Sequence, residues 1–429
     1  MRDKKVLIIA YYWPPAGGPG VQRWLKFVKY LPEFGYEPIV YVPENPSYPI
    51  VDQSLITEIP AEVTVVKRPI KEPYGWASTL SRKRTKTISS GIVPKQKKQS
   101  LLEKLMLFVR GNFFIPDARV GWVQPSITFL KKYIAEHQIE AIITTGPPHS
   151  LHLIGKGLKD WQPTLKWYAD FRDPWTTIGY HDKLKMTTKT KATHKRLESE
   201  VLNIADHVIV TSPGTQKEFG HLTSKPITVL TNGYDDRPPA NHKKNSKFTL
   251  AHIGSLLSDR NPQVLWKVLG ALCDENADFK KNVSLQLVGK VSSEIIVSIQ
   301  EAGLESILDL KGYVSHQKAQ QYQVHASALV LIEINEEHTK GIIAGKIFEY
   351  LAAQRPIIAI GPRGADIEHI LKTTEAGIFV DYDGFQKLKI EILELYTNWL
   401  QGNETYNGRG IEKYHRREIT KALAQLLTQ

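Results

Sequence analysis

The stretch VLIIAYYWPPAGGPG, residues 6–20, decides which fold class we expect for this chain. It joins a short apolar run to a loop of prolines and glycines, and a helical pattern begins near Val21. A buried strand, a glycine-containing loop and a helix in this order are typical of the first unit of a parallel α/β sheet. The run breaks at Pro14 and Pro15 with no small-residue cleavage site, so we expect a strand and not a signal peptide.

Working outward, strands of the same kind recur through the first half of the chain. Most are short and largely apolar, as expected for strands buried on both faces, and helix-length segments separate them. The predicted strands are Val6–Tyr11, Pro38–Val42, Val63–Lys67, Ala141–Thr145, Leu165–Asp170, His207–Thr211 and Ile227–Thr231. Their alternation with helices predicts an open, doubly wound parallel sheet.

The pattern starts again after a break at NGYDDRPP, residues 232–239. An Asn-Gly pair, two prolines and the loss of periodicity mark this segment as a domain linker. The strands predicted beyond it are Phe248–Ile253, Ser284–Val288, Asp309–Gly312, Leu329–Ile334, Pro356–Ile360 and Gly377–Val380. The sequence therefore predicts an α/β protein of two Rossmann-like domains, residues 1–235 and 236–410, with a terminal helix at 411–429.

The net charge is concentrated in the first of these domains. The 429 residues contain 56 Lys and Arg against 44 Asp and Glu, a formal net charge of +12. Up to Asp235 the count is 33 basic against 21 acidic residues, whereas beyond it there are 23 of each. A one-sided basic domain favours an anionic partner, and the alternative is a solvated face that keeps the protein in solution.

The excess is densest in an insertion at about residues 71–115, where residues 71–110 hold 10 basic and 2 acidic side chains. A polar basic segment, Ser78–Ser100, precedes an amphipathic apolar pattern at Leu101–Phe114. This combination is typical of an anionic membrane surface. The alternatives are a helix that packs on its own domain and, less favoured, a groove for single-stranded nucleic acid.

The single cysteine, Cys273, excludes a disulfide scaffold and a cysteine-based zinc site, and it fits a reducing compartment. No apolar run approaches the 18 or so residues of a transmembrane helix. We therefore expect a cytoplasmic protein that associates peripherally with the inner face of the membrane.

Candidate functional residues of the first domain follow its predicted strands. Gly17 and Gly18 lie between the first strand and a helix start, a place that suits a phosphate or carboxylate. Their spacing differs from the dinucleotide G-x-G-x-x-G pattern, which weakens the case for a hydride-transfer enzyme. His149 follows the strand at 141–145, at the sheet edge where ligands bind in open α/β folds.

A third group, Asp170, Arg172 and Asp173, follows the strand at 165–170. Charged side chains here can anchor a polyhydroxy ligand such as a sugar. An Arg-Asp pair can equally be a clasp that holds a loop. The sequence leaves both interpretations open.

In the second domain, Gly254 and Ser255 end the first strand, and Arg260 precedes a helix. Arginine suits bidentate recognition of a phosphate. Gly345 and Lys346 stand at another helix start, where a diphosphate is favoured.

Two further residues complete this candidate site. Glu349, one helical turn after Gly345, can accept hydrogen bonds from ribose hydroxyls, and Gly364 follows a later strand. At strand ends these residues together predict a site for a nucleoside diphosphate.

These motifs resemble those of the GT-B glycosyltransferases of family 4, within them the bacterial enzymes that build polysaccharides or glycoconjugates. The resemblance covers essentially the whole chain. It rests on the first loop, the linker Asn232–Asp235, the element from Gly254 to Arg260 and the helix start Lys346–Tyr350. It implies two Rossmann-like domains that face a cleft, and a helix near Arg416–Thr420 that crosses back to the first domain.

The resemblance also implies an activity. A hexosyl or N-acetylhexosaminyl group would pass with retention from a UDP- or GDP-type sugar, held by the C-terminal domain, to a glycan or lipid-linked acceptor held by the N-terminal domain. No metal or other cofactor is expected. By correspondence, Arg260 and Lys346 would contact the diphosphate and Glu349 the ribose. Gly17 and Gly18 would lie near the phosphates, and His149 would be the active-site histidine.

The chain departs from the family pattern at two positions. Gly341 stands eight residues before Glu349, so the first glutamate of the E-x7-E motif is absent, and Ser255 replaces a basic residue that often follows the glycine. The identity of the donor is therefore not implied. The alternatives are a GT-B sugar-nucleotide epimerase, and a membrane- or nucleic-acid-binding protein on the same scaffold with no turnover.

Overall fold

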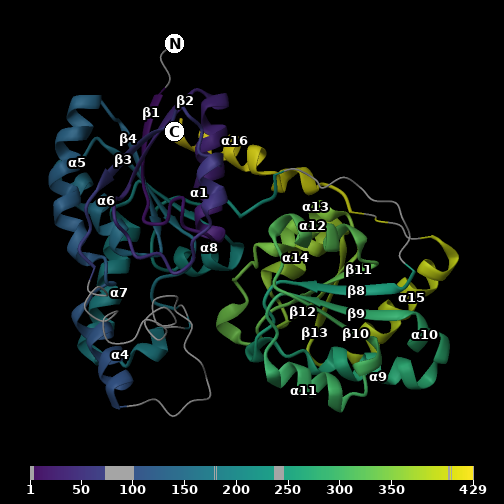
Figure 1. Cartoon of the computed structure of the whole chain (residues 1–429). Helices are drawn as coiled ribbons and strands as arrows, with labels where there is room; N and C mark the ends of the chain where they lie inside the picture. The colour runs from purple at the N-terminus through teal and green to yellow at the C-terminus, as the bar shows by residue number, and fades with distance from the viewer. Residues whose placement is uncertain are drawn as a thin grey trace. The chain divides into compact units, whose positions relative to one another are not determined.

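The computed structural model describes residues 4–72, 101–177, 179, 181–235, 246–403, 406 and 408–428. The basic segment Ser78–Ser100 of the membrane prediction lies outside these ranges. The chain divides into two compact units (Figure 1). The N-terminal unit comprises Met1–Asn232 together with Arg416–Gln429, and the C-terminal unit comprises Gly233–His415.

The N-terminal unit is built on a seven-stranded parallel sheet in the order β3-β2-β1-β4-β5-β6-β7. Its strands are β1 (Lys4–Ile9), β2 (Tyr36–Pro43), β3 (Thr64–Arg68), β4 (Ala141–Gly146), β5 (Lys166–Phe171), β6 (His207–Val210) and β7 (Ile227–Val229). The strand order reverses between β1 and β4. In open α/β sheets, ligands bind beyond the carboxyl ends of the strands at such a reversal.

The central strand β1 shows why the opening run is continuously apolar. Leu7 and Ile9 belong to the core on one face of the sheet, whereas Val6 and Ile8 belong to the core on the other. All four are fully buried. Because successive side chains of a strand point to opposite faces, a strand covered on both sides needs an apolar residue at every position.

Helices cover both faces of this sheet. The helices of this unit are α1 (Pro19–Tyr30), α4 (Leu101–Phe113), α5 (Val123–His137), α6 (Ser150–Trp161), α7 (Thr188–Ile204), α8 (Pro213–Gly220) and α16 (Arg416–Leu427). The helices that contribute side chains to the cores on the two faces are α1, α5, α6, α7, α8 and α16. Although α16 is far from α1 in sequence, it lies beside it in Figure 1, yellow against purple. Leu423 of α16 is fully buried in the same core as Val28 of α1, and Arg416 donates to Gln22 Oε1 at 3.0 Å.

Only one face of the helix α4 packs against the rest of its unit. Leu107 is buried, and a Cβ on Gly111 would lie 2.3 Å from the carbonyl oxygen of Leu184 in the short helix η4 (His181–Leu184). Apolar side chains on the opposite face are exposed, namely Leu105, Phe108, Val109 and Phe113. None of the helices in the described ranges has the length and hydropathy needed to span a bilayer.

The C-terminal unit repeats this topology in a six-stranded parallel sheet ordered β10-β9-β8-β11-β12-β13. Its strands are β8 (Phe248–Ile253), β9 (Val283–Val288), β10 (Leu308–Gly312), β11 (Ala328–Ile332), β12 (Ile357–Gly361) and β13 (Gly377–Asp381). Its helices are α9 (Gln263–Glu275), α10 (Ala277–Asn282), α11 (Ser293–Glu301), α12 (His316–His325), α13 (Lys346–Ala353), α14 (Asp366–Thr374) and α15 (Phe385–Gln401). The predicted fold class, two Rossmann-like parallel α/β units, is confirmed.

Candidate functional site

The reversal of strand order in the C-terminal unit falls between β8 and β11, and Gly254 directly follows β8. Gly254 has a φ of +120°, and a Cβ there would lie 2.8 Å from Lys346 Nζ. Gly289, with a φ of +121°, packs in turn on the carbonyl oxygen of Gly254. Larger residues would need a strained backbone and would push the ammonium away. Glycine at 254 therefore lets the lysine reach the strand end.

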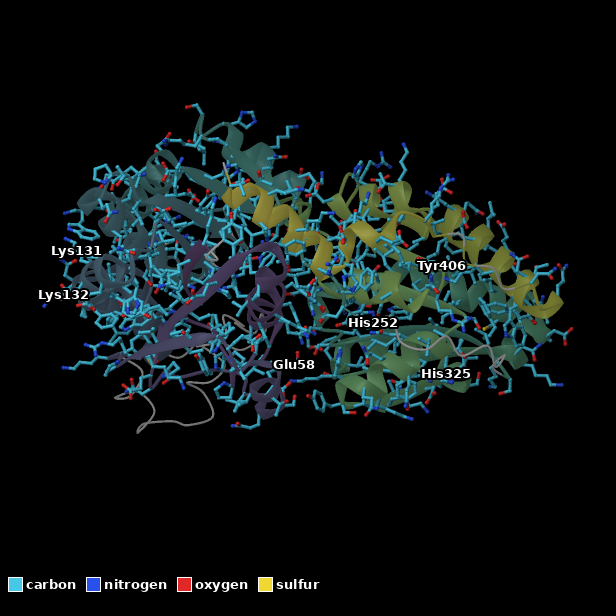
Figure 2. The ribbon with its side chains drawn as sticks, turned by 90° about the horizontal axis from the view of Figure 1, so that it is seen from above. Glu58, Lys131, Lys132, His252, His325 and Tyr406 are labelled. Carbon is cyan, nitrogen blue, oxygen red and sulfur yellow. The ribbon has the colours of Figure 1, made fainter. Side chains whose placement is uncertain are left out.

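Lys346 begins α13, and its Nζ lies 3.4 Å from His252 Nε2. His252, which Figure 2 shows within the C-terminal unit, hydrogen-bonds the carbonyl of Val330 through Nδ1 at 2.9 Å. Because a carbonyl only accepts, Nδ1 carries the proton and Nε2 is free to accept from Lys346. Burial and the lysine charge hold the pKa of His252 well below its usual range, which keeps the imidazole neutral.

Arg260 ends the short helix η5 (Ser258–Arg260) and supplies a second cation beside Lys346. Its Nε is buried and has no hydrogen-bond partner within the described part of the chain. Burial, assisted by Arg260, lowers the pKa of Lys346 to about 8. Two cations within electrostatic reach of one another are suited to an anion with more than one negative charge.

The sequence prediction missed one acidic residue at this edge, Glu333. We expected the strand to continue through Ile334, but β11 ends at Ile332, so Glu333 is the first residue beyond it. Its side chain is only 3% exposed and Oε1 has no hydrogen-bond partner among the described residues. Burial raises the pKa of Glu333 to about 7, although Arg260 and Lys346 act to lower it. The available signal was a single glutamate in an apolar run.

The other predicted residues of this unit lie around the same edge. One carboxylate oxygen of Glu349 accepts from Gln323 Nε2 of α12 at 3.0 Å. Gly345 caps α13 in helical conformation, and Ser255 is exposed. Gly364, with a φ of +79°, lies between β12 and α14 and donates from its amide to Glu368.

A separate polar hollow of about 390 Å³ lies at the other end of the strands. Thr249 and Ser284, near the amino ends of β8 and β9, line it together with His325 of α12. In Figure 2, His325 marks this hollow, and His252 marks the predicted donor site beside Lys346. The hollow contains none of the residues predicted for the donor site.

In the N-terminal unit, the first loop is held to its surroundings by backbone contacts. The Gly17 amide donates to Ile50 O at 3.0 Å, and Gly18, with a φ of +106°, precedes α1. A Cβ on Gly20 would overlap the Arg172 guanidinium, so a larger residue there would displace the arginine side chain. Arg172 also donates through Nε to Gly146 O at 3.1 Å. It thus joins the loops that follow β1 and β4.

Asp170 is fully buried, and side chains occupy both of its carboxylate oxygens. It accepts from Arg23 at 2.8 Å, from Trp24 Nε1 at 2.9 Å and from Thr145 Oγ1 at 2.8 Å. These contacts, like those of Arg172, are the ones expected of a loop clasp. Asp173 is half-buried, and burial raises the pKa of its carboxyl. A role for this group in sugar binding stays a prediction.

His149 directly precedes α6 and stacks on Trp175, with ring centroids 5.0 Å apart and planes within 3°. It is 3% exposed, and neither ring nitrogen has a hydrogen-bond partner in the described ranges. Burial, with help from His152 and His181, holds the pKa of His149 well below its usual range. The imidazole is therefore neutral, and it can donate or accept one hydrogen bond without carrying charge.

The described residues contain no cluster of three or more His, Cys, Asp or Glu side chains arranged to hold a metal ion. Among the described residues, Arg260 and Glu333 in the C-terminal unit and His149 in the N-terminal unit have buried side-chain atoms without a hydrogen-bond partner.

No protein-family model and no curated protein sequence matches this chain. Solved structures do. Sucrose-phosphate synthase from Thermosynechococcus elongatus matches with a TM-score of 0.63 and 15% identity, over 99% of this chain and 98% of that one. HepE from Anabaena, in complex with UDP, matches with a TM-score of 0.63 and 14% identity over 99% of both chains.

A third match is WaaG, a glycosyltransferase involved in lipopolysaccharide biosynthesis, with a TM-score of 0.55 and 12% identity over 99% of both chains. At these identities the likeness establishes the fold, and it extends over both units. The two parallel sheets and the whole-chain matches show that this protein has the GT-B glycosyltransferase fold.

Proposed function

We propose that this protein is a glycosyltransferase that moves a hexosyl or N-acetylhexosaminyl group, with retention, from a UDP- or GDP-type sugar to a glycan or lipid-linked acceptor. The observation that carries the proposal is the pair of cations, Arg260 and Lys346, at the carboxyl edge of the C-terminal sheet. The solved structure of HepE with UDP-glucose, which shares the fold, supports a nucleotide sugar as the ligand of this edge.

In the proposed reaction, the bond between the sugar and the diphosphate breaks, and negative charge grows on the leaving diphosphate. Arg260 and Lys346 would stabilise that charge more strongly in the transition state than in the ground state. His252 contributes by position, since its unprotonated Nε2 faces the lysine ammonium. Glu349, held by Gln323, would accept hydrogen bonds from the ribose.

On the N-terminal unit, His149 would orient the acceptor or the transferred sugar as a neutral hydrogen-bonding group. Gly17 and Gly18 would bring backbone amides close to the phosphates. Asp170 and Arg172 would hold the loops that present these residues, because their side chains already bond to those loops or to neighbouring elements.

The decisive experiment removes one cation and leaves the fold intact. With nucleotide sugars as donors, Arg260→Ala should lower turnover at least about 100-fold, the effect typical of losing one transition-state donor. Lys267→Ala removes an exposed cation of α9 and is the matched control. Turnover within a few-fold of the unaltered protein in Arg260→Ala would contradict the proposal.

A second measurement separates transfer from the alternatives. Free nucleotide should be released only when an acceptor is present. Release without acceptor would instead support a sugar-nucleotide epimerase, and the absence of nucleotide binding in a thermal-shift screen with UDP, GDP and ADP would support a binding-only protein.

We also propose that the N-terminal unit binds an anionic membrane through α4. The exposed apolar side chains of α4 lie at positions 105, 108, 109 and 113, which share one helical face, while Leu107 and Gly111 face the protein. The strongly basic sequence of Ser78–Ser100 precedes this helix. An apolar face beside basic residues binds anionic lipid surfaces.

This second proposal predicts salt-sensitive sedimentation with phosphatidylglycerol vesicles. The double change Phe108→Ser and Phe113→Ser should reduce the bound fraction several-fold. Leu400→Ser, which removes an exposed apolar side chain from α15, should leave it unaltered. If the double variant and the unaltered protein bind equally, α4 packs on its own unit and does not bind the membrane.

A further inference from the structure

The backbone of Glu333 is held in place by its neighbours. Its amide donates to Ile360 O at 2.8 Å, and its carbonyl oxygen accepts from Tyr382 Oη at 2.7 Å. The Cβ of Glu333 lies 3.1 Å from where a Cβ on Gly361 would stand. The backbone is thus fixed from β12 and from the residue after β13, while carboxylate Oε1 is left without a partner in the described chain.

The charged groups that act on Glu333 come from separate elements. Arg260 of η5 and Lys346 of α13 favour its ionised form, and Tyr382, which donates to its carbonyl oxygen, is a third titratable group within electrostatic reach. Glu349 and His252 act on Lys346. In the absence of a ligand and above about pH 7, the ionised carboxylate therefore partly balances two cations in a buried place, where unbalanced charge is costly.

A diphosphate diester brings two negative charges to the same cations. An ionised Glu333 would then face the ligand with like charge and with no donor for Oε1. A proton taken from solvent by the carboxylate removes this repulsion. The protonated carboxyl also gains a hydrogen that it can donate to an oxygen of the ligand.

We propose that Glu333 is the counter-charge and positioning residue of the Arg260–Lys346 pair, and that it takes up one proton when the diphosphate of a nucleotide sugar binds. The inference rests on the proposed function in that it takes these two cations as the diphosphate site. It concerns a residue outside the E-x7-E positions Gly341 and Glu349.

The sign of the resulting pH dependence follows from linkage. A ligand that binds together with a proton binds more weakly as pH rises above the pKa of the free site, by up to about tenfold per pH unit. Since burial sets the pKa of Glu333 to about 7, the loss of affinity should begin near neutrality.

Lys346 also titrates, with a pKa lowered to about 8 by burial, so its contribution must be removed. Lys346→Arg keeps a positive charge that does not titrate in this range. UDP-glucose and GDP-glucose are suitable probes, because their diphosphate diesters hold a constant charge from pH 6 to 9.

The experiment measures the dissociation constant of whichever probe binds, at pH 6 to 8.5, in Lys346→Arg and in Lys346→Arg combined with Glu333→Gln. In Lys346→Arg, the affinity for the probe should weaken about tenfold or more from pH 6 to 8.5. In the double variant, the affinity should change less than about twofold. Glu336→Gln, which neutralises an exposed glutamate three residues away, should retain the full pH dependence. Calorimetry in two buffers of different ionisation enthalpy should show proton uptake that Glu333→Gln abolishes.

The outcomes separate the two proposals. Binding whose pH dependence is the same with and without Glu333→Gln overturns the role of Glu333 and leaves the glycosyltransferase proposal standing. If the unaltered protein binds neither probe nor any other nucleotide sugar, the proposed function is overturned, and the role of Glu333 with it.

Discussion

The two parallel sheets share a strand order, yet the buried acidic residues at their carboxyl edges differ in their hydrogen bonding. In the N-terminal unit, Asp170 is fully buried and accepts from three side chains, one of them the cation Arg23. In the C-terminal unit, Glu333 is nearly as buried but keeps a carboxylate oxygen without a partner in the described chain.

This difference distinguishes a structural anchor from a ligand site. Buried polar atoms are almost always hydrogen-bonded, because an unpaired one costs free energy on folding. Where the fold satisfies every atom, as at Asp170, the residue contributes to stability. Where it leaves a buried carboxylate oxygen unsatisfied within electrostatic reach of two cations, as at Glu333, a ligand is the natural partner.

The largest effect on stability should come from replacing Asp170, the acid whose carboxylate oxygens are both hydrogen-bonded. Asp170→Asn removes the charge that faces buried Arg23, and a buried cation left without its partner typically costs about 3–5 kcal/mol. Urea unfolding of the purified variant measures the change. A loss below about 1 kcal/mol would mean that the hydrogen bonds, and not the ion pair, hold this edge.

Replacing Glu333, the acid with an unpartnered oxygen, should change the free energy of unfolding by less and in the opposite direction. Burial raises the pKa of Glu333 to about 7, above its value in an unfolded chain, so its ionisation destabilises the folded state. The cost is absent below about pH 4 and complete above about pH 7. Glu333→Gln should therefore raise the free energy of unfolding by about 1–3 kcal/mol at pH 8 and by much less at pH 5. An equal change at both pH values would show that ionisation is not the cause.

The smallest effect is expected at an exposed pair on the same C-terminal unit. Arg363 lies 2.9 Å from Asp381 and is 85% exposed. Solvent and salt screen such a pair, so Arg363→Ala should leave the thermal midpoint unaltered at physiological ionic strength. A clear decrease would show that exposed charges on this unit matter as much as buried ones.

The sequence was sufficient to predict the fold because buried parallel strands require continuous apolar runs, and each predicted run coincides with an observed strand within a few residues. It also pointed to Gly254, Arg260 and Lys346, since strand ends and helix starts can be recognised locally. The structure places Lys346 against Gly254 and within electrostatic reach of Arg260.

Other features depend on packing that sequence spacing does not reveal. Asp170 bonds to Arg23, 147 residues away, only because α1 packs on the sheet beside β5. Glu333 escaped prediction because strand ends are uncertain by a few residues, and an error of two placed it inside a strand. The neutrality of His149 depends on its burial against Trp175, which the loop sequence alone does not indicate.

The position of α16 has a consequence for biosynthesis. Its residues Ile419, Leu423 and Leu427 complete a core that otherwise consists of residues before Asn232. During translation, α16 is made only after the whole C-terminal unit, so the N-terminal unit lacks this helix while the C-terminal unit is synthesised. A shortened gene that stops after the first unit would therefore yield a polypeptide with an uncovered apolar surface, prone to aggregate and to be degraded.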